Sequence, residues 1–466
     1  MATDTSVVVL IAGALGSQLS WTDTSDPAPV LIWPPNLGDE LEGYRWNTQL
    51  LSDSVEPDGI IMTAGCDLCP IYQPLVDRLE SWGFRRADRT LIPLAYDWRK
   101  SAADVAGQLA NTISSIGQSL PSPSIAILAH SFGGLVSRYY LESGDFHPDE
   151  HVTQLIMMAT PNLGAPDALI TRMGGDTIPT VGSVEVRRLA DDARYPSTYQ
   201  LFPPVSEIFA YDSSNSGKEI DVYDPANGLM PNSSNLNSAI QFHARLDASR
   251  RQVKYFCFYG QHHPTYTAAY LRRQPDGTFR LDKAKTQKMA DQGDGTVPIS
   301  SARLPLPDAD LNGNSAAPHE TIFQDDDLLR ALASLLGKPQ QALAIAPRVQ
   351  VFASRRPLRR DRTARIVVKF PKTAEMIRGT LRVEKVDPQG RTMRVVSTHS
   401  IAREGTAETR RPMKVPLPKT SGTYRLAFQR LDRSEPETVE TFYVRPSEQT
   451  RKRKRERAGR KRRSAK

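Results

Sequence analysis

The sequence is short of cysteine and of long apolar runs. Only three cysteines occur in 466 residues, which excludes a disulfide framework. No apolar run reaches the roughly 20 residues that a membrane helix needs. Residues 7–13 are apolar, but the segment before them has no Lys or Arg, so they predict a first strand and not a secretory signal. These absences predict a cytoplasmic chain, and the length allows a sizeable core.

The cysteine pattern gives little sign of a metal site. Cys66 and Cys69 form one CxxC pair, and no second pair completes a zinc site. Two loop thiols in a reducing compartment are favoured over a metal pair, and Cys257 is predicted to lie in a core strand. We therefore expect no metal and no cofactor.

The positive charge of the chain is confined to its end. Residues 450–466 hold eleven Lys or Arg and one Glu, which leaves 49 basic and 51 acidic residues elsewhere. Such a segment predicts a disordered basic tail over residues 447–466. The tail either binds an anionic membrane surface or nucleic acid, or only keeps the chain in solution without a specific partner.

Apolar strands and amphipathic helices alternate through the first 340 residues. The helices are predicted at residues 73–82 and 101–118. The strands are predicted at residues 7–13, 91–96, 125–129, 154–160 and 253–260. This alternation predicts an α/β fold with a doubly wound, mostly parallel sheet covered on both faces.

Two stretches interrupt the alternation. Residues 165–250 hold apolar and aromatic residues among prolines, and they predict a cap or lid inserted above the sheet. Residues 265–285 predict a β-hairpin that turns at Pro275, Asp276 and Gly277.

The pattern changes beyond residue 340. Short alternating strands separated by turn residues predict a small immunoglobulin-like β-sandwich over residues 345–446. Tyr424 is placed to form a tyrosine corner in this domain. The domain organisation predicted is a catalytic domain over residues 1–340, the sandwich and the tail.

The segment "AILAHSFGGL" combines a buried strand, a serine and a helix. Ala129 and Gly133 lie two positions before and after Ser131. A sharp strand-to-helix turn requires small residues at these positions, so the pattern predicts a nucleophile elbow. The turn directs the hydroxyl of Ser131 outward, at the positive end of the helix. The alternative is a glycine-rich turn that only packs a helix closely on a sheet.

A serine needs a base and an orienting acid to become a nucleophile. In a hydrolase sheet of this kind, both follow the serine in the chain. Asp294 lies between two glycines in "QGDGTVP", and His319 lies in "PHETIF" before a helix. We therefore predict Ser131, Asp294 and His319 as a triad, with Asp291 as the rival acid.

The remaining histidines have other predicted roles. His130 is adjacent to the serine and should point away from the pocket as a hydrogen-bonded core histidine. His399 lies in the predicted sandwich. His262 and His263 follow a sheet strand, where they either line the mouth of the site or have no substrate role.

The reaction also needs donors for a developing oxyanion. The N–H of Phe132, the residue after the serine, is one such donor. The glycine-rich loop at residues 11–19 is the expected source of the second, and its alternative is an ordinary first turn. This loop lacks GxGxxG spacing, so nucleotide binding is not expected.

Taken together, these motifs resemble the lecithin:cholesterol acyltransferase family, which includes lysosomal phospholipase A2 and the phospholipid:diacylglycerol acyltransferases. The resemblance covers about residues 7–337. It is carried by "VVLIAGALGSQL", "AYDWRKS", "ILAHSFGGL", "ATPNLGAP", "YPSTYQLFPP", "GDGTVP" and "HETIF". In "AYDWRKS" we treat Asp97 and Arg99 as a structural ion pair. The chain departs from the family at Ala12, where proline is usual, and at Ala129, the first residue of the elbow.

The resemblance implies an α/β-hydrolase fold and a serine esterase, lipase, phospholipase or O-acyltransferase acting on a lipid-like or other apolar ester. It implies Ser131 as nucleophile, Asp294 as acid and His319 as base, with Ala14 and Phe132 as oxyanion donors. The alternative is a catalytically silent scaffold on a hydrolase fold, which recruits partners through its sandwich and basic tail.

Overall fold

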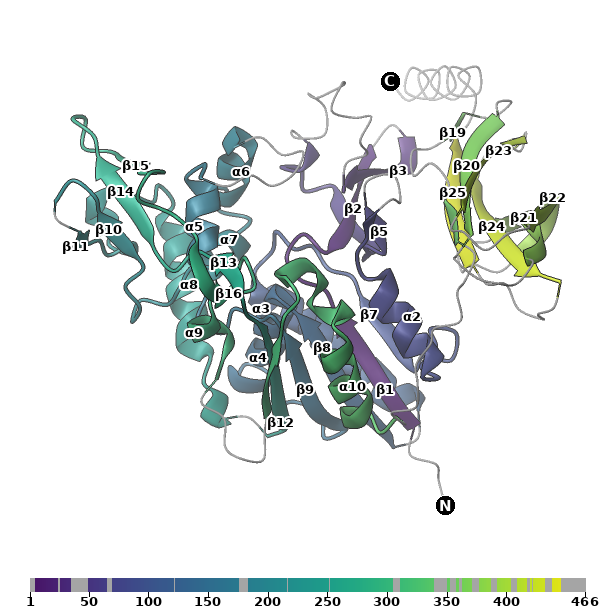
Figure 1. Ribbon diagram of the computed structural model, residues 1–466, viewed down its shortest axis with the longest axis horizontal. Coiled ribbons are helices and arrows are strands. Elements are labelled where there is room, and N and C mark those ends of the chain that lie inside the picture. Colours follow the sequence, from purple (N-terminus) through teal and green to yellow (C-terminus); the bar gives the residue numbers. More distant parts are fainter. Residues whose placement is uncertain are drawn as a thin grey trace, which may run out of the picture. The chain divides into compact units, whose positions relative to one another are not determined.

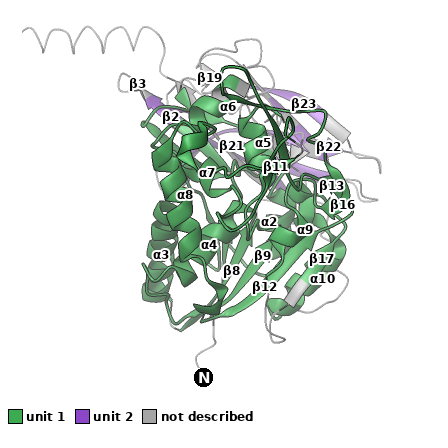
Figure 2. Ribbon diagram, turned by 90° about the vertical axis from the view of Figure 1, so that its left-hand side faces the viewer, with its two compact units in different colours: residues 1–20, 32–343 green, residues 21–31, 344–466 purple. Residues whose placement is uncertain are grey.

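The computed structural model divides the chain into two compact units, residues 1–20 with 32–343 and residues 21–31 with 344–466 (Figure 2). Among the described residues, no helix is both long and apolar enough to cross a membrane. The structure describes residues 5–23, 26–34, 49–64, 69–120, 122–175, 183–215, 217–250, 252–304, 311–338, 350–352, 358–359, 363–370, 377–386, 392–403, 409–416, 420, 422–431 and 438–445.

The first unit is built on a six-stranded parallel sheet in the order β17-β12-β9-β8-β1-β7 (Figure 1). Its strands are β1 (Thr5–Ile11), β7 (Leu91–Leu94), β8 (Pro123–His130), β9 (Val152–Met158), β12 (Lys254–Gly260) and β17 (Leu311–Ser315). The central strands are apolar on both faces because helices cover both sides of the sheet. The α/β-hydrolase prediction is confirmed by this order of strands.

The order of the strands places the functional site. From β1 the chain adds β7 on one side, and it then adds β8, β9, β12 and β17 on the other. β1 and β8 are neighbours, with Ile11 opposite Ala129. The loops that leave their carboxyl ends therefore meet at the topological switch point, where open α/β sheets bind their ligands.

Four helices cover the sheet. α2 (Gln73–Ser81) and α10 (Asp326–Leu335) lie on one face, and α3 (Ala102–Ser119) and α4 (Phe132–Glu142) lie on the other (Figures 1 and 2). The hydroxyl of Ser101 caps α3 by accepting from the N–H of Asp104. The carboxylate of Asp325 caps α10 in the same way, by accepting from the N–H groups of Asp327 and Leu328.

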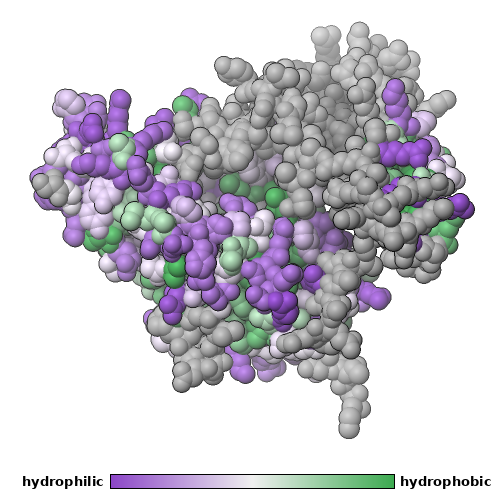
Figure 3. All heavy atoms as spheres, viewed as in Figure 1, coloured by the Kyte–Doolittle hydropathy of each residue, from purple (hydrophilic) through white to green (hydrophobic). Residues whose placement is uncertain are grey.

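The predicted cap has its own core, which joins residues far apart in the chain. Its sheet runs β11-β10-β14-β15, so the hairpin predicted at residues 265–285 completes it. Figure 3 shows a largely hydrophilic surface over this hairpin, where Arg272, Arg273 and Arg280 are exposed. The elements are α5 (Pro166–Arg172), α6 (Ser183–Ala190), α7 (Ser197–Gln200), β10 (Ala210–Asp212), β11 (Lys218–Glu219), η2 (Pro225–Asn227), α8 (Ser233–Arg245), η3 (Ala248–Arg250), β14 (Ala269–Arg273) and β15 (Phe279–Leu281).

The chain has several further short elements outside the main sheet. They are β2 (Ser17–Asp23), β3 (Asp26–Trp33), β4 (Val55–Ile60), β5 (Thr63–Ala64), β6 (Cys69–Pro70), β13 (His263–Thr265), β16 (Met289–Gly293), α9 (Ile299–Ala302) and η4 (His319–Gln324). Cys66 lies outside the described residues. Cys257 is buried on β12, as predicted for a core strand.

The second unit is a sandwich of a three-stranded sheet, β18-β20-β23, and a five-stranded sheet, β19-β25-β24-β21-β22. One apolar core combines side chains of both sheets. The hydroxyl of Tyr424 donates to the carbonyl of Thr420 at 2.9 Å, which is the bond of a tyrosine corner. The strands are β18 (Gln350–Phe352), β19 (Leu358–Arg359), β20 (Thr363–Phe370), β21 (Ile377–Val386), β22 (Thr392–Arg403), β23 (Thr409–Pro416), β24 (Gly422–Arg430) and β25 (Thr438–Arg445). The predicted basic tail lies outside the described residues.

Candidate active site

Ser131 occupies a strained turn between β8 and α4. Its backbone has φ 51° and ψ −124°, a conformation that residues other than glycine rarely adopt. The N–H of Ser131 donates to the carbonyl of Met158 at 2.9 Å, and the carbonyl of Ser131 accepts from the N–H of Gly134 at 2.9 Å. These bonds hold the turn in place, as expected for a nucleophile elbow.

The small residues around Ser131 are required by close packing. A Cβ on Gly133 would lie 2.5 Å from the carbonyl oxygen of Ala12, and a Cβ on Gly13 would lie 2.8 Å from the Cβ of Ser131. The loop that follows β1 therefore packs its backbone directly against the elbow. Larger side chains at either glycine would separate the loop from the serine.

Ser131, His319 and Asp294 form a continuous line of hydrogen bonds. Nε2 of His319 lies 3.0 Å from Oγ of Ser131, and Nδ1 of His319 lies 2.8 Å from Oδ2 of Asp294. Because the carboxylate can only accept, Nδ1 carries the proton and Nε2 is left to accept from the serine hydroxyl. The residues are 8%, 8% and 1% exposed, respectively.

The turn after β16 stabilises the ionised form of Asp294. Its Oδ1 accepts from the N–H groups of Thr296 and Val297 at 2.9 and 2.7 Å. Burial alone would raise the pKa of Asp294, but His319 and these two N–H groups outweigh it and hold the pKa below its usual value. A Cβ on Gly260 would lie 2.4 Å from the Cβ of Asp294, so the end of β12 must also be small.

His319 is held by its backbone as well as by its ring. Its N–H donates to the carbonyl of Asp294 at 2.9 Å, which joins the acid loop to the base loop. Burial lowers the pKa of His319, but the charge of Asp294 and its hydrogen bond to the ring outweigh burial and raise the pKa above its ordinary value. The ring is therefore a stronger base than a histidine in water.

The rival acid and the other histidines lie elsewhere. Asp291 is mostly exposed, and it pairs at 3.3 Å with His262, which is also mostly exposed. His263 hydrogen-bonds the carbonyl of Ala316 at 2.8 Å. His399 belongs to the second unit. The structure thus brings only Asp294, of the two candidate acids, to the ring of His319.

Phe132, one predicted oxyanion donor, follows Ser131 in the chain, and Ala14, the other, follows Gly13, which packs against Ser131. The loop after β1 closes with the N–H of Gly16 donating to the carbonyl of Gly13 at 3.0 Å, and Leu15 has a positive φ of 63°. The indole N–H of Trp33 fixes this loop by donating to the carbonyl of Leu15 at 2.8 Å. Among the hydrogen bonds of the described part of the chain, none uses the N–H of Ala14 or of Phe132.

Sequence reasoning missed Tyr72, which lies against the site from the start of α2. Its hydroxyl oxygen accepts from the N–H of Gly13 at 2.8 Å and lies 2.7 Å from Nδ1 of His130. The ring of Phe323 stacks on it with a centroid distance of 5.2 Å. No motif marks Tyr72, because its partners are 58 and 59 residues away in the chain.

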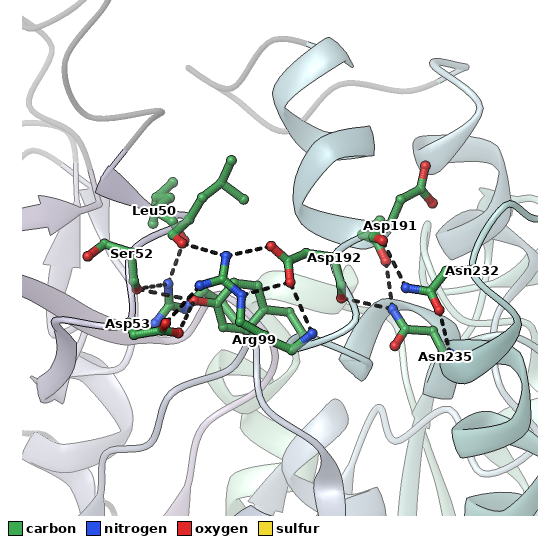
Figure 4. A network of polar contacts seen from close by, with 12 residues as sticks. Leu50, Ser52, Asp53, Arg99, Asp191, Asp192, Asn232 and Asn235 are labelled. Atoms are coloured by element: carbon green, nitrogen blue, oxygen red, sulfur yellow. Dashed lines mark hydrogen bonds and ion pairs between the residues drawn. The ribbon is translucent and has the colours of Figure 1, made fainter.

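The Asp97–Arg99 ion pair has the structural role expected of it. Arg99 is buried and binds the carboxylate of Asp97 through two nitrogens, at 2.8 and 2.7 Å. The same guanidinium donates to the carbonyls of Leu50 and Ser52, so it fastens the segment before β4 to the sheet (Figure 4).

A second arginine continues this network into the cap. Arg194 contacts the carboxylates of Asp53 and Asp192, at 2.9 and 2.6 Å. Asn235 of α8 donates to the carbonyl of Asp192 at 3.0 Å (Figure 4). The network therefore connects the segment before β4 to the cap and its helix α8.

The fold and the line of hydrogen bonds define the class of protein: an α/β-hydrolase fold that presents a serine, a histidine and an aspartate in triad geometry. The comparison with protein families then shows which family the chain is similar to. The family model for lecithin:cholesterol acyltransferase matches residues 64–230, which confirms the resemblance seen in the sequence. The match includes Ser131 and ends before Asp294 and His319.

One curated relative is lecithin-cholesterol acyltransferase-like 4 from Arabidopsis thaliana. It is 23% identical over 184 residues, which cover 35% of this chain. The chain spans 33% of the length of that relative. The similarity is therefore confined to a part of both proteins.

Two solved structures show a weak likeness. The product of gene lin2722 from Listeria innocua is 12% identical, with a TM-score of 0.30, over 72% of this chain and 95% of that one. Phospholipase PlaB from Legionella pneumophila is 12% identical, with a TM-score of 0.26, over 94% of this chain and 90% of that one. Because these TM-scores are low, the assignment of the fold is based on the strand order of the chain itself.

Proposed function

We propose that the chain is a serine acyl hydrolase or acyltransferase that forms an acyl-enzyme on Ser131. The observation that carries the proposal is the buried line of hydrogen bonds from Ser131 through His319 to Asp294. The match to the lecithin:cholesterol acyltransferase family supports an acyl ester as the substrate.

In the first half of the reaction, Oγ of Ser131 attacks the carbonyl carbon of the ester while Nε2 of His319 takes the hydroxyl proton. The N–H groups of Ala14 and Phe132 stabilise the oxyanion, and Asp294 stabilises the imidazolium. His319 then returns the proton to the leaving oxygen as its bond to the acyl carbon breaks. An alcohol departs and the acyl group stays on Ser131.

In the second half, water or an alcohol attacks the acyl-enzyme. His319 accepts a proton from the attacking oxygen and passes it to Oγ of Ser131 as the ester bond to the enzyme breaks. Water yields a free acid, and an alcohol yields a new ester. The two outcomes use the same triad, so the acceptor is determined by which molecule reaches the acyl-enzyme.

The substrate that we propose is a lipid-like ester. The name of the plant relative and the family of the matched segment both support this class. The cap follows the elbow strand and its neighbour, and it has an apolar core that includes Leu169, Phe202 and Phe209. Binding of the basic tail to membrane or nucleic acid, and a cytoplasmic location, stay predictions.

The alternative of a silent scaffold has less support. A vestigial site would not need a strained serine backbone or an acid held by two N–H groups. Strain of this kind costs free energy and persists where the surrounding structure maintains it. The geometry therefore favours catalysis.

The proposal is tested by turnover of short- and long-chain nitrophenyl esters. Ser131→Ala should lower kcat/KM by about 10⁴-fold or more. The matched control is Ser143→Ala, which alters a buried serine at the end of α4, away from the triad. A Ser131→Ala protein as active as the Ser143→Ala protein would overturn the proposal.

A further inference from the structure

A second chain of hydrogen bonds runs behind the triad. The N–H of Gly13 donates to the hydroxyl oxygen of Tyr72 at 2.8 Å, and this hydroxyl lies 2.7 Å from Nδ1 of His130. Nε2 of His130 lies 3.0 Å from the carbonyl oxygen of His319. This series of hydrogen bonds thus connects the loop that holds Ala14, a predicted oxyanion donor, to the backbone of the catalytic base His319.

The direction of the bonds in this series follows from its acceptor end and from the neutral state of His130. The carbonyl of His319 can only accept, so Nε2 of His130 carries a proton and donates through it. A neutral imidazole with its proton on Nε2 has a bare Nδ1, which accepts the hydroxyl proton of Tyr72. The hydroxyl oxygen of Tyr72 also accepts from the N–H of Gly13, so in this form all four groups have their partners.

The surroundings of His130 maintain this neutral form. Burial and the neighbouring His319 ring lower the pKa of His130 to about 3. The ring of His130 lies against Tyr72, His319 and the ring of Phe323, whose centroid lies 5.3 Å away, edge to face. The charge of Asp294 acts in the opposite direction on the pKa of His130, but burial and His319 outweigh it. A second proton on Nδ1 would oppose the hydroxyl proton of Tyr72.

We propose that Tyr72 and His130 are positioning residues, which hold the oxyanion loop and the backbone of His319 in register around Ser131. The proposal rests on the proposed function, because the relative position of these groups affects turnover only if the triad is catalytic. Neither side chain takes part in bond making. Each acts through Gly13, next to Ala14, or through the carbonyl of His319.

The geometry explains why both ends need to be fixed. The Nε2 atom of His319 must remain within hydrogen-bonding distance of the serine while the donors remain aimed at the oxyanion. Removing the Tyr72 hydroxyl leaves the N–H of Gly13 and Nδ1 of His130 without their partner. Both loops then gain freedom of movement. The transition state therefore loses more stabilisation than the bound substrate does, and kcat falls.

The experiment compares Tyr72→Phe with Tyr140→Phe. Both tyrosines are buried, and each accepts a backbone N–H through its hydroxyl, from Gly13 and from Asp149 respectively. Tyr72→Phe should lower kcat by about 10- to 100-fold, because a misplacement of reacting groups by about 1 Å can cost about 100-fold in rate, with KM changed less than about twofold. Tyr140→Phe should change kcat by less than about threefold.

The double variant Tyr72→Phe/His130→Phe provides a readout that separate structural roles would not give. Residues that act as one chain have non-additive effects. The double variant should therefore lose about as much kcat as the more damaging single variant. Losses that multiply would show two unconnected roles and overturn the proposal.

The state of His130 is measured in the active wild-type protein, so the test does not depend on the folding of variants. Nitrogen NMR of imidazole-labelled protein should show His130 neutral and protonated at Nε2 from about pH 5 to 8, with assignment by His130→Gln. A proton on Nδ1 in this range would overturn the proposal, because Tyr72 could not then donate.

The outcomes separate this proposal from the proposed function. A wild-type protein without turnover and without labelling of Ser131 by a fluorophosphonate would overturn both. A labelled and active wild type, with equal kcat in Tyr72→Phe and Tyr140→Phe, would overturn the positioning role alone.

Discussion

The two units of the chain bury polar groups in different ways. The sandwich has a core of apolar side chains and a partly buried cluster in which Glu384 binds Arg425 and Arg382, and it also buries Arg403 and Arg430. Among the described residues, the first unit buries more ionisable groups, and most of them lie along the carboxyl edge of the sheet or on the elbow helix. They include Asp97, Arg99, His130, Arg138, Glu142, Asp294 and His319.

The difference coincides with the place of the proposed chemistry. A buried charge costs free energy unless it is paired and hydrogen-bonded. In the first unit each such group has partners: for example, Arg138 binds Glu142 at 2.8 Å and donates to the carbonyl of Asn162 at 3.1 Å. Asn162 in turn donates to the carbonyl of Ala302 on α9, which follows the loop of Asp294.

The largest effect beyond loss of the nucleophile is expected at Asp294. Asp294→Asn should lower kcat/KM by about 10⁴-fold, because the amide no longer fixes the Nδ1–H form of His319. The polar contacts to Thr296 and Val297 can persist through the amide oxygen, so the melting temperature should change little. Ester turnover and calorimetry check both parts. The matched control is Asp291→Asn, at the exposed rival acid, which should keep turnover within about threefold.

The pH dependence of kcat/KM provides a second measurement on the same pair. His319 must be neutral to accept a proton, so activity falls as the pH drops through its pKa. Because Asp294 raises this pKa, the midpoint in the wild type should lie above about 6.5, the ordinary value for histidine. In Asp294→Asn the midpoint should move to lower pH. A midpoint that did not move would show that another group controls the acid limb.

The next largest effect is expected at the Arg99 network. Arg99→Met leaves the carboxylate of Asp97 buried without its partner, so the free energy of unfolding of the first unit should fall by about 3–5 kcal/mol. Asp97→Leu/Arg99→Met removes both charges and should recover a part of that loss. Calorimetry of the intact chain measures both variants. Equal melting of Arg99→Met and wild type would show that the pair does not hold this part of the fold.

A matched change in the sandwich should affect stability without affecting chemistry. Leu381 is fully buried in its core, and Leu381→Ala should lower the stability of this unit by about 2–5 kcal/mol. Turnover by the folded protein should remain within about twofold of wild type. A large loss of kcat at a temperature where the variant is folded would show that the two units are coupled in catalysis.

The fold was predictable where local signals were strong. The strands at 123–130 and 152–158 are runs of apolar residues, and the elbow has small residues at both required positions. β17 was missed because its sequence, "LNGNS", has almost no apolar residue. The pairing of β10 with β14 was missed because the two strands are far apart in the chain.

The same division applies to the site. Ser131, Asp294 and His319 lie in motifs whose order in the chain is typical of hydrolases, so each could be proposed from the sequence. Tyr72 could not, because its role depends on the packing of α2 against the switch point. His130 was expected to be a hydrogen-bonded core residue, and its ring is hydrogen-bonded at both nitrogens.

The measurement that tests the central claim most directly is intact-mass analysis of the wild type and Ser131→Ala after reaction with a fluorophosphonate. The account predicts one adduct on the wild type, located at Ser131 by peptide mapping, and none on Ser131→Ala. An adduct of equal yield on both proteins, or no adduct on a folded wild type that turns over esters, would contradict the account.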